Sequence, residues 1–73
     1  MATEVCAEMV ANVVTLVVGA GDSVAAGDTL LILESMKMEI PVQAPANGTV
    51  VRLFCREGGQ VSAGQDLAVL VED

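Results

Sequence analysis

The side chains able to carry chemistry are few in this sequence, and one lysine stands out among them. Lys37 is the only lysine of the chain, and histidine is absent. A lysine amine is a nucleophile on a long, flexible stem, and it can form an amide with an activated acyl group. Without histidine, zinc sites built on imidazole ligands and the Ser-His-Asp and Cys-His catalytic arrangements are excluded. The chain therefore offers one site for an amide-linked cofactor, no histidine-based metal site, and no recognisable catalytic centre.

The two cysteines, Cys6 and Cys55, are far apart in the sequence and do not form a CxxC motif. In a cytosolic chain, we expect such cysteines to be reduced, partly buried thiols. Arg56 is the only neighbouring cation that could lower a thiol pKa, so the sequence gives little support for a redox role.

Composition excludes several classes of protein. The 73 residues include ten acidic and three basic ones, which gives a net charge of −7. Phosphate backbones repel such a chain, and its one aromatic residue, Phe54, cannot stack a series of bases, so we expect no nucleic-acid partner. The longest apolar stretch, residues 13–20, is too short to cross a membrane. The first eight residues lack the Lys or Arg of a signal peptide, and we expect a cytoplasmic protein without membrane contact.

The chain contains two copies of one unit, offset by 37 residues. With this offset, nine of the 21 positions from 13 to 33 are identical to their counterparts, and all nine are apolar residues or glycines. The identical pairs are Val13/Val50, Val14/Val51, Leu16/Leu53, Gly21/Gly58, Val24/Val61, Ala26/Ala63, Gly27/Gly64, Leu30/Leu67 and Leu33/Leu70. Each copy predicts a strand, a glycine turn, a short extended piece, a second glycine turn and another strand.

The repeat predicts an all-β fold in one domain, residues 1–73. The expected strands are Val13–Val18, Thr29–Leu33, Thr49–Cys55 and Leu67–Val71, with short extended pieces at Val24 and Val61. Neither copy can bury its apolar face alone, so we expect a pseudo-twofold flattened barrel or sandwich of antiparallel strands. Strand alternation assigns one face to the core, namely Val51, Leu53 and Cys55, together with Val14, Leu16 and Val18 from the first copy.

The segment between the two copies, residues 34–41, predicts a hairpin with an unusual tip. It joins the strand Thr29–Leu33 to the extended segment Ile40–Gln43. The tip contains none of the Gly, Asn or Asp residues that two-residue hairpin loops prefer, and it carries two methionines beside Lys37. Departures from local rules of this kind tend to mark functional sites. A solvated turn with a chance lysine is the alternative interpretation.

The residues from Glu34 to Glu39, ESMKME, resemble the biotin-acceptor motif, usually Glu-Ala-Met-Lys-Met, of biotin carboxyl carrier domains. The glycine turns and residues 44–50, APANGTV, also resemble this biotinyl/lipoyl attachment family, and the resemblance covers essentially the whole chain. It implies a barrel-sandwich hybrid, a flattened barrel of two four-stranded antiparallel sheets. It also implies that Lys37 lies at a β-hairpin tip, opposite the two termini.

The resemblance further implies a carrier that is not itself catalytic. A biotin protein ligase would activate biotin as an acyl-adenylate, and the amine of Lys37 would attack it. A biotin carboxylase would then load CO₂, and a carboxyltransferase would pass it to an acyl-CoA or 2-oxoacid. The flanking Met36 and Met38 would be adaptable contacts for the ligase or braces of the turn. Glu34 and Glu39 would be recognition charges or a solvated face, and Ser35 replaces the commoner Ala.

Three alternatives to a biotin carrier differ in class. Lipoate on Lys37 would make a carrier for a 2-oxoacid dehydrogenase complex, although the Met-Lys-Met sequence fits the biotin pattern better. An unmodified structural adaptor is a second alternative, since folds of this kind also occur without a cofactor. The third, an autonomous enzyme, has no support beyond scattered carboxylates. A carrier that must visit two active sites is expected to be a monomer.

Overall fold

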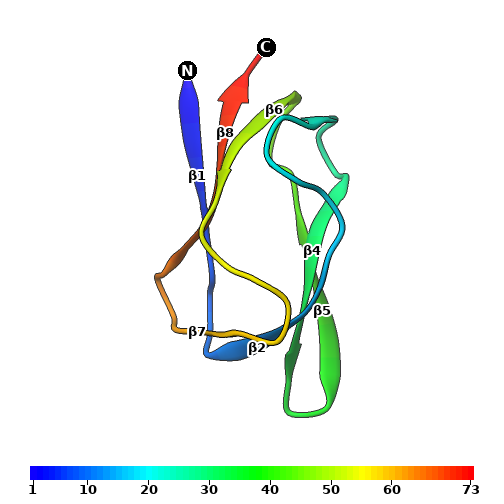
Figure 1. Cartoon of the computed structure of the whole chain (residues 1–73), viewed down its shortest axis with the longest axis vertical. Coiled ribbons are helices and arrows are strands. Elements are labelled where there is room, and N and C mark those ends of the chain that lie inside the picture. Colours follow the sequence, from blue (N-terminus) through cyan, green and yellow to red (C-terminus); the bar gives the residue numbers. More distant parts are fainter.

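The computed structural model describes all residues, 1–73, as two four-stranded antiparallel sheets (Figure 1). The strands are β1 (Ala2–Cys6), β2 (Ala11–Leu16), β3 (Ser23–Val24), β4 (Thr29–Ser35), β5 (Met38–Gln43), β6 (Gly48–Leu53), β7 (Gln60–Val61) and β8 (Asp66–Glu72). One sheet has the order β1-β8-β6-β3, and the other has the order β5-β4-β2-β7. The predicted all-β barrel-sandwich architecture is confirmed.

The internal repeat is visible strand by strand. Adding 37 to the bounds of β2, β3 and β4 gives the bounds of β6, β7 and β8. The sequence of buried and exposed positions along β4 is the same as that along β8. The order β1-β8-β6-β3 becomes β5-β4-β2-β7 when each strand is replaced by its counterpart, so the sheets are related by the predicted pseudo-twofold symmetry.

A single apolar core lies between the sheets. It contains 14 buried residues, and no polar side chain is buried with them. Leu30 and Leu31 from β4 and Leu67 and Leu70 from β8 are completely inaccessible to solvent. Burying a leucine side chain contributes about 1.5–3 kcal/mol, so these residues fix the two central strands that carry the rest of the fold.

The predicted core assignment is wrong at Val14 and Val51, and a β-bulge explains the error. These two valines are 41% and 44% exposed, while the preceding Val13 and Val50 are buried. The strand register shifts at each exposed valine, which leaves one extra residue on β2 and on β6. The alternation between buried and exposed side chains shifts by one residue at each bulge. The other four residues predicted for the core do pack against it: Leu16, Val18, Leu53 and Cys55.

Strand ends differ from the sequence prediction by a few residues. β2 and β6 begin before residues 13 and 49 and end at Leu16 and Leu53. β4 continues past Leu33 to Ser35, and β5 begins at Met38, so the hairpin between the copies is longer than expected. The extra residues lengthen the hairpin and leave only two residues for its turn.

The molecule is elongated, with principal extents of 35 × 18 × 16 Å. The N- and C-termini lie together at one end of the long axis, and the β4–β5 hairpin projects from the other end (Figure 1). The termini are joined by a hydrogen bond in which the Glu72 amide donates to the Met1 carbonyl, 2.9 Å long. No helix of the structure has the length and hydrophobicity needed to cross a membrane.

Candidate functional site

The β4–β5 hairpin closes with two residues, Met36 and Lys37. Ser35 and Met38 form the last pair of the ladder before the turn. Met36 has φ 54° and Lys37 has φ 65°, and positive φ at both central residues is typical of a type I′ turn. The twist of this turn matches that of the strands, so the hairpin remains regular up to its tip. Met36 is 92% exposed and Lys37 is also exposed, so the amine stands free at the far end of the molecule.

Pairs of residues behind the turn alternate between the core and solvent. Leu33 is buried and pairs with the half-buried Ile40, which anchors the hairpin to the core. The next pair toward the tip is Glu34 opposite Glu39, and both are exposed. Two carboxylates directly opposite each other destabilise a sheet, so this pair is not explained by the needs of the fold.

Comparison with known proteins identifies the family of the chain that carries this hairpin. The model of the Biotin_lipoyl family, described as "Biotin-requiring enzyme", matches residues 1–70. The chain belongs to the Biotin_lipoyl family. This result agrees with the resemblance carried by residues 34–39 and by the glycine turns.

Relatives of this Biotin_lipoyl domain include proteins of the same size. The chain is 47% identical over 70 residues to the "Biotinylated protein TB7.3 homolog" of Mycobacterium leprae, covering 96% of this chain and 99% of that protein. It is 51% identical over 70 residues to the protein of the same name from Mycolicibacterium smegmatis, with the same coverage. Among solved structures, the urea carboxylase of Kluyveromyces lactis matches with a TM-score of 0.90 and 35% identity over 97% of this chain. The chain covers 6% of that carboxylase.

The six motif residues of the Biotin_lipoyl domain occupy one continuous stretch around the turn. Five of them are exposed, and Ser35 is half-buried. Met38 is 63% exposed, so neither methionine is packed into the core in the way expected of a brace for the turn. The structure therefore places all the predicted site residues together at the tip of the hairpin.

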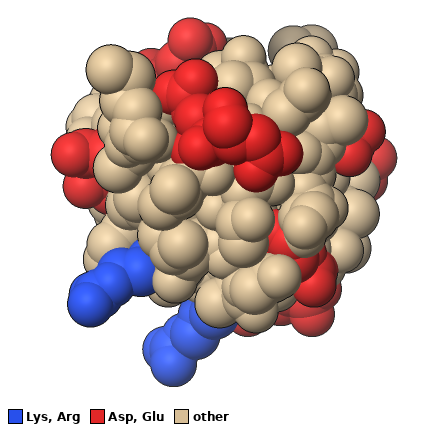
Figure 2. All heavy atoms as spheres, turned by 90° about the horizontal axis from the view of Figure 1, so that it is seen from above, with Lys and Arg blue, Asp and Glu red and all other residues tan.

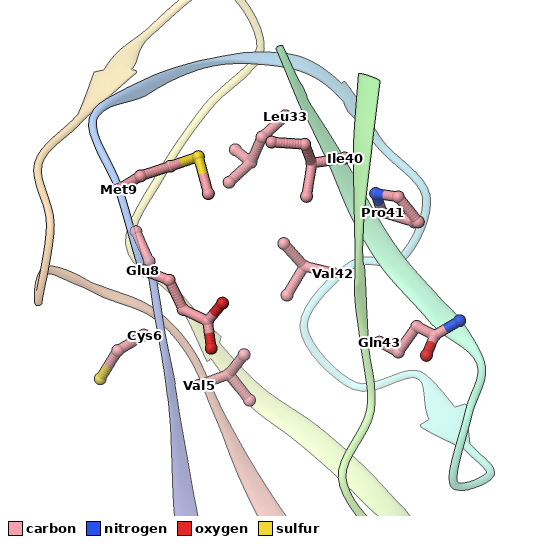
Figure 3. A pocket seen from close by; sticks show the side chains of 10 residues that line it. Val5, Cys6, Glu8, Met9, Leu33, Ile40, Pro41, Val42 and Gln43 are labelled. Atoms are coloured by element: carbon pink, nitrogen blue, oxygen red, sulfur yellow. The ribbon is translucent and has the colours of Figure 1, made fainter. Parts of the chain in front are cut away.

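An apolar cleft of about 230 Å³ lies beside the base of the hairpin, and sequence analysis missed it. One side of the cleft is formed by the end of β1 and the loop that follows it, and the other side by β5 (Figure 3). β1 and β5 are each an outermost strand of their sheet. The Glu8 carboxylate extends into this cleft toward Val5 and Val42, and Met9 lies near Leu33. Its lining residues come from segments far apart in the sequence, so no local motif could have revealed it.

A second hollow of about 360 Å³ lies next to β7, on the same sheet as the hairpin. It is more polar than the cleft and includes the only aromatic residue and one of the two arginines. Its lining residues are Phe54, Cys55, Arg56, Gly59, Gln60, Val61 and Gln65. The only signal in the sequence is the unusual composition of residues 52–56, RLFCR, in an acidic chain.

The two cysteines are free thiols, and Cys6 is exposed instead of partly buried as predicted. It lies on β1, an outermost strand, directly after the inward-facing Val5. The Cys6 thiol donates a hydrogen bond to the Asp66 carboxylate, 3.1 Å long, which raises the pKa of the thiol. Burial raises the pKa of Cys55. Both shifts favour the protonated thiol over the reactive thiolate.

Glu4 joins this pair, and the possible ligand atoms of Glu4, Cys6 and Asp66 lie within 4.8 Å of one another. A hydrogen bond and charge repulsion from Asp66 raise the pKa of the Glu4 carboxyl. Metal ligation by cysteine requires the thiolate, whereas here the thiol is a hydrogen-bond donor. The cluster lies on β1 and β8, and none of its residues belongs to the hairpin.

Proposed function

We propose that this protein is a biotin carboxyl carrier and that biotin is attached to Lys37. The observation that carries the proposal is the position of the only lysine, exposed at the tip of a two-residue turn at the far end of the molecule. Membership of the Biotin_lipoyl family and close similarity to proteins named as biotinylated support this assignment.

The residues at the tip fit an amide-linked cofactor. In the proposed attachment, the Lys37 Nζ forms an amide with the carboxyl group of biotin, and its positive charge is lost. The buried Leu33 and its partner Ile40 hold the base of the hairpin, so the flexible lysine stem pivots on a fixed support. Biotin, when bound, carries an activated carboxyl group between active sites, and the tether replaces free diffusion by a high local concentration.

The proposed partners are a biotin protein ligase, a biotin carboxylase and a carboxyltransferase. The similarity of this chain to one segment of the Kluyveromyces lactis urea carboxylase, at 35% identity, supports a role in carboxylation. Met36 and Met38 are assigned as adaptable contacts for the ligase because their exposed thioethers have no packing role in the core. We place the carrier in the cytoplasm as a monomer that visits each enzyme in turn.

The attachment site is tested by intact-mass spectrometry and avidin blotting of protein purified from cells supplied with biotin. The wild type is expected to gain the mass of one biotinyl group. The Lys37→Arg variant keeps the positive charge but cannot form the amide, so it is expected to show no added mass and no avidin signal. Thermal unfolding of both proteins checks that the variant is folded.

Two results would contradict the proposal. A lipoyl mass on Lys37 without any biotin adduct would assign the domain to the lipoyl carriers of the same family. An avidin signal that persists in the folded Lys37→Arg variant would move the attachment away from the hairpin tip.

A further inference from the structure

The apolar cleft extends toward the attachment hairpin and has no equivalent beside the chain ends. With the offset of 37, its lining residues Ile40 and Met9 correspond to Thr3 and Ala46. Neither the cleft nor the second hollow includes Thr3 or Ala46, although the two sheets have the same strand order. The fold therefore does not require this cleft, which belongs to the half of the molecule that carries Lys37.

One face of β5 makes an apolar path from the turn to the cleft. No bulge interrupts the pairing of β5 with β4 between Met38 and Val42, so Met38, Ile40 and Val42 point to the same face. Ile40 and Val42 line the cleft, and Met38 is 63% exposed next to the turn. Met9 is also exposed and lies near Leu33 on the other side of the cleft (Figure 3). Accessible apolar side chains thus lead from the turn into the cleft.

Glu8 is the only charged residue that lines the cleft. Its carboxylate extends into the cleft toward Val5 and Val42 (Figure 3). None of the side-chain hydrogen bonds of the structure involves this carboxylate. An ionised carboxylate only accepts hydrogen bonds, so the cleft offers one acceptor to a ligand with N–H groups. Apolar walls with a few polar groups are the usual composition of a small-molecule site.

The distance from Lys37 decides which group can occupy the cleft. At about 3.4 Å per strand residue, Ile40 lies about 10 Å and Val42 about 17 Å from Lys37. An extended lysine side chain is about 6 Å long and ends before the cleft. With a biotinyl group on Nζ, the bicyclic ring begins about 14 Å from the Cα atom, and the ureido nitrogens lie about 17 Å away. The lysine alone is therefore too short, whereas the biotinylated side chain reaches the part of the cleft that contains the Glu8 carboxylate.

We propose that the cleft is a resting site for the biotinyl group of the same molecule. Met9, Ile40 and Val42 hold the bicyclic ring, and the Glu8 carboxylate accepts a hydrogen bond from a ureido N–H. The proposal rests on the proposed function, and the similarity to proteins named as biotinylated supports this choice of occupant. The dithiolane ring of lipoate, the alternative cofactor, has no N–H group to donate to Glu8.

The tether makes a weak contact sufficient for such a site. A short flexible link gives the ring a local concentration in the millimolar range, so the ring occupies the cleft for part of the time even at low intrinsic affinity. Molecules with the ring in the cleft are closed to a partner that must surround the ring, and the apparent affinity of that partner falls by the same fraction.

NMR spectra of the unmodified and the biotinylated protein test the resting site directly. Both forms are isotope-labelled, and their modification state is verified by intact mass. Biotinylation is expected to shift the methyl resonances of Met9, Ile40 and Val42 and to produce nuclear Overhauser contacts between these methyl groups and the ring. Val71, exposed on the other sheet, is expected to keep its resonances. Changes confined to residues 34–39 would overturn the resting site.

The rate at which streptavidin captures the biotinylated protein measures how often the ring is outside the cleft. Met9→Ala removes part of one wall and is expected to raise this rate about twofold to fivefold. Val10→Ala is the matched control, because Val10 is the next residue, is 56% exposed and does not line the cleft. This control is expected to keep the wild-type rate. Thermal unfolding is measured for both variants.

The hydrogen bond to Glu8 has its own pair of variants. Glu8→Gln replaces an ionised acceptor by a weaker neutral one, and it is expected to raise the capture rate about twofold. Asp73→Asn removes the same charge at the end of the molecule that carries the termini, where several acidic side chains are exposed (Figure 2). It is expected to leave the rate unchanged, which separates the hydrogen bond from the net charge.

The outcomes separate the resting site from the carrier function. A biotinylated wild type with the same capture rate as Met9→Ala and Glu8→Gln overturns the resting site and leaves the carrier function standing. A wild type that carries no biotin after growth with biotin supplied overturns both proposals.

Discussion

At the scale of single residues, the turn Met36–Lys37 combines a strained backbone with full exposure. A left-handed conformation costs an ordinary residue about 1–2 kcal/mol, and both residues of this turn adopt it. Glycine or asparagine would remove most of that cost, yet the chain has a methionine and a lysine there. Lysine is explained by the amide that it is proposed to form, and the exposed methionine by its proposed contact with the enzyme that forms this amide.

The strain and the recognition role at Met36 can be separated by substitution. Met36→Asn is expected to stabilise the domain by about 0.5–1 kcal/mol, because asparagine tolerates positive φ. The same variant is expected to lower the kcat/KM of biotinylation about tenfold, through loss of an apolar contact with the ligase. Urea unfolding and the ligase assay measure the two effects.

Met36→Leu is the control for this substitution, since it keeps the apolar bulk and the strain. It should match the wild type within about twofold in biotinylation and in stability within about 0.5 kcal/mol. If Met36→Asn were labelled as fast as the wild type, Met36 would have no part in recognition. A loss of stability in Met36→Asn would show that the methionine braces the turn.

At the scale of strands, the sequence predicted which strands repeat. It did not predict which residues of each strand face the core. The offset of 37 predicted which strands correspond, because the identical residues are those that fill the core and the glycine turns. It could not predict the bulges at Val14 and Val51, because either valine of the pairs 13–14 and 50–51 suits the buried face of a strand. Repetition even reinforced the error, since both copies carry the same bulge.

The residues of the hairpin tip were predictable from the motif, whereas the row of polar side chains that crosses the hairpin sheet behind it was not. Residues 34–39 are contiguous in the sequence, so they must lie close together in any fold. The row Gln60, Asn12, Glu34 and Glu39 depends on the register of three strand pairs, which no local pattern reports. The same holds for the cluster around Cys6, whose partner Asp66 lies on β8.

Gly48, at the start of β6, shows how closely the central strands approach. A Cβ atom at this position would clash with the Val71 carbonyl oxygen, a backbone atom of β8. Gly48→Ala is therefore expected to destabilise the domain by about 2–4 kcal/mol, since β6 must move away from β8. Urea unfolding at 25 °C gives the free energy of unfolding for the comparison with the wild type.

The equivalent residue of the first copy is the control. Ala11, at the start of β2, is buried and carries the Cβ atom that Gly48 cannot accommodate. Ala11→Gly is expected to cost only about 1 kcal/mol, from the added freedom of the unfolded chain. Similar losses for the two variants would show that the contact of Gly48 with β8 is not the cause.

At the scale of the whole molecule, the pseudo-twofold symmetry relates the attachment hairpin to the chain ends. The pair Glu34 and Glu39 corresponds to Val71 and Ala2, and Ser35 and Met38 correspond to Glu72 and Met1. The termini are thus an open version of the hairpin at the opposite end of the long axis (Figure 1). The proposed attachment site on Lys37 is therefore at the end of the molecule that is farthest from both termini.

Head-to-tail cyclisation through one added glycine tests this correspondence. With a glycine between Asp73 and Met1, the ends would close as a two-residue Asp-Gly loop, the counterpart of Met36–Lys37 and a favoured type I′ sequence. Since Glu72 already donates to the Met1 carbonyl, closure requires little movement, and the loss of chain entropy in the unfolded state is expected to add about 2–4 kcal/mol of stability. Biotinylation at the opposite end should keep the kcat/KM of the linear protein. Unchanged or reduced stability would show that the ends are not paired as the hairpin is, and slower biotinylation would mean that the ligase also contacts the ends.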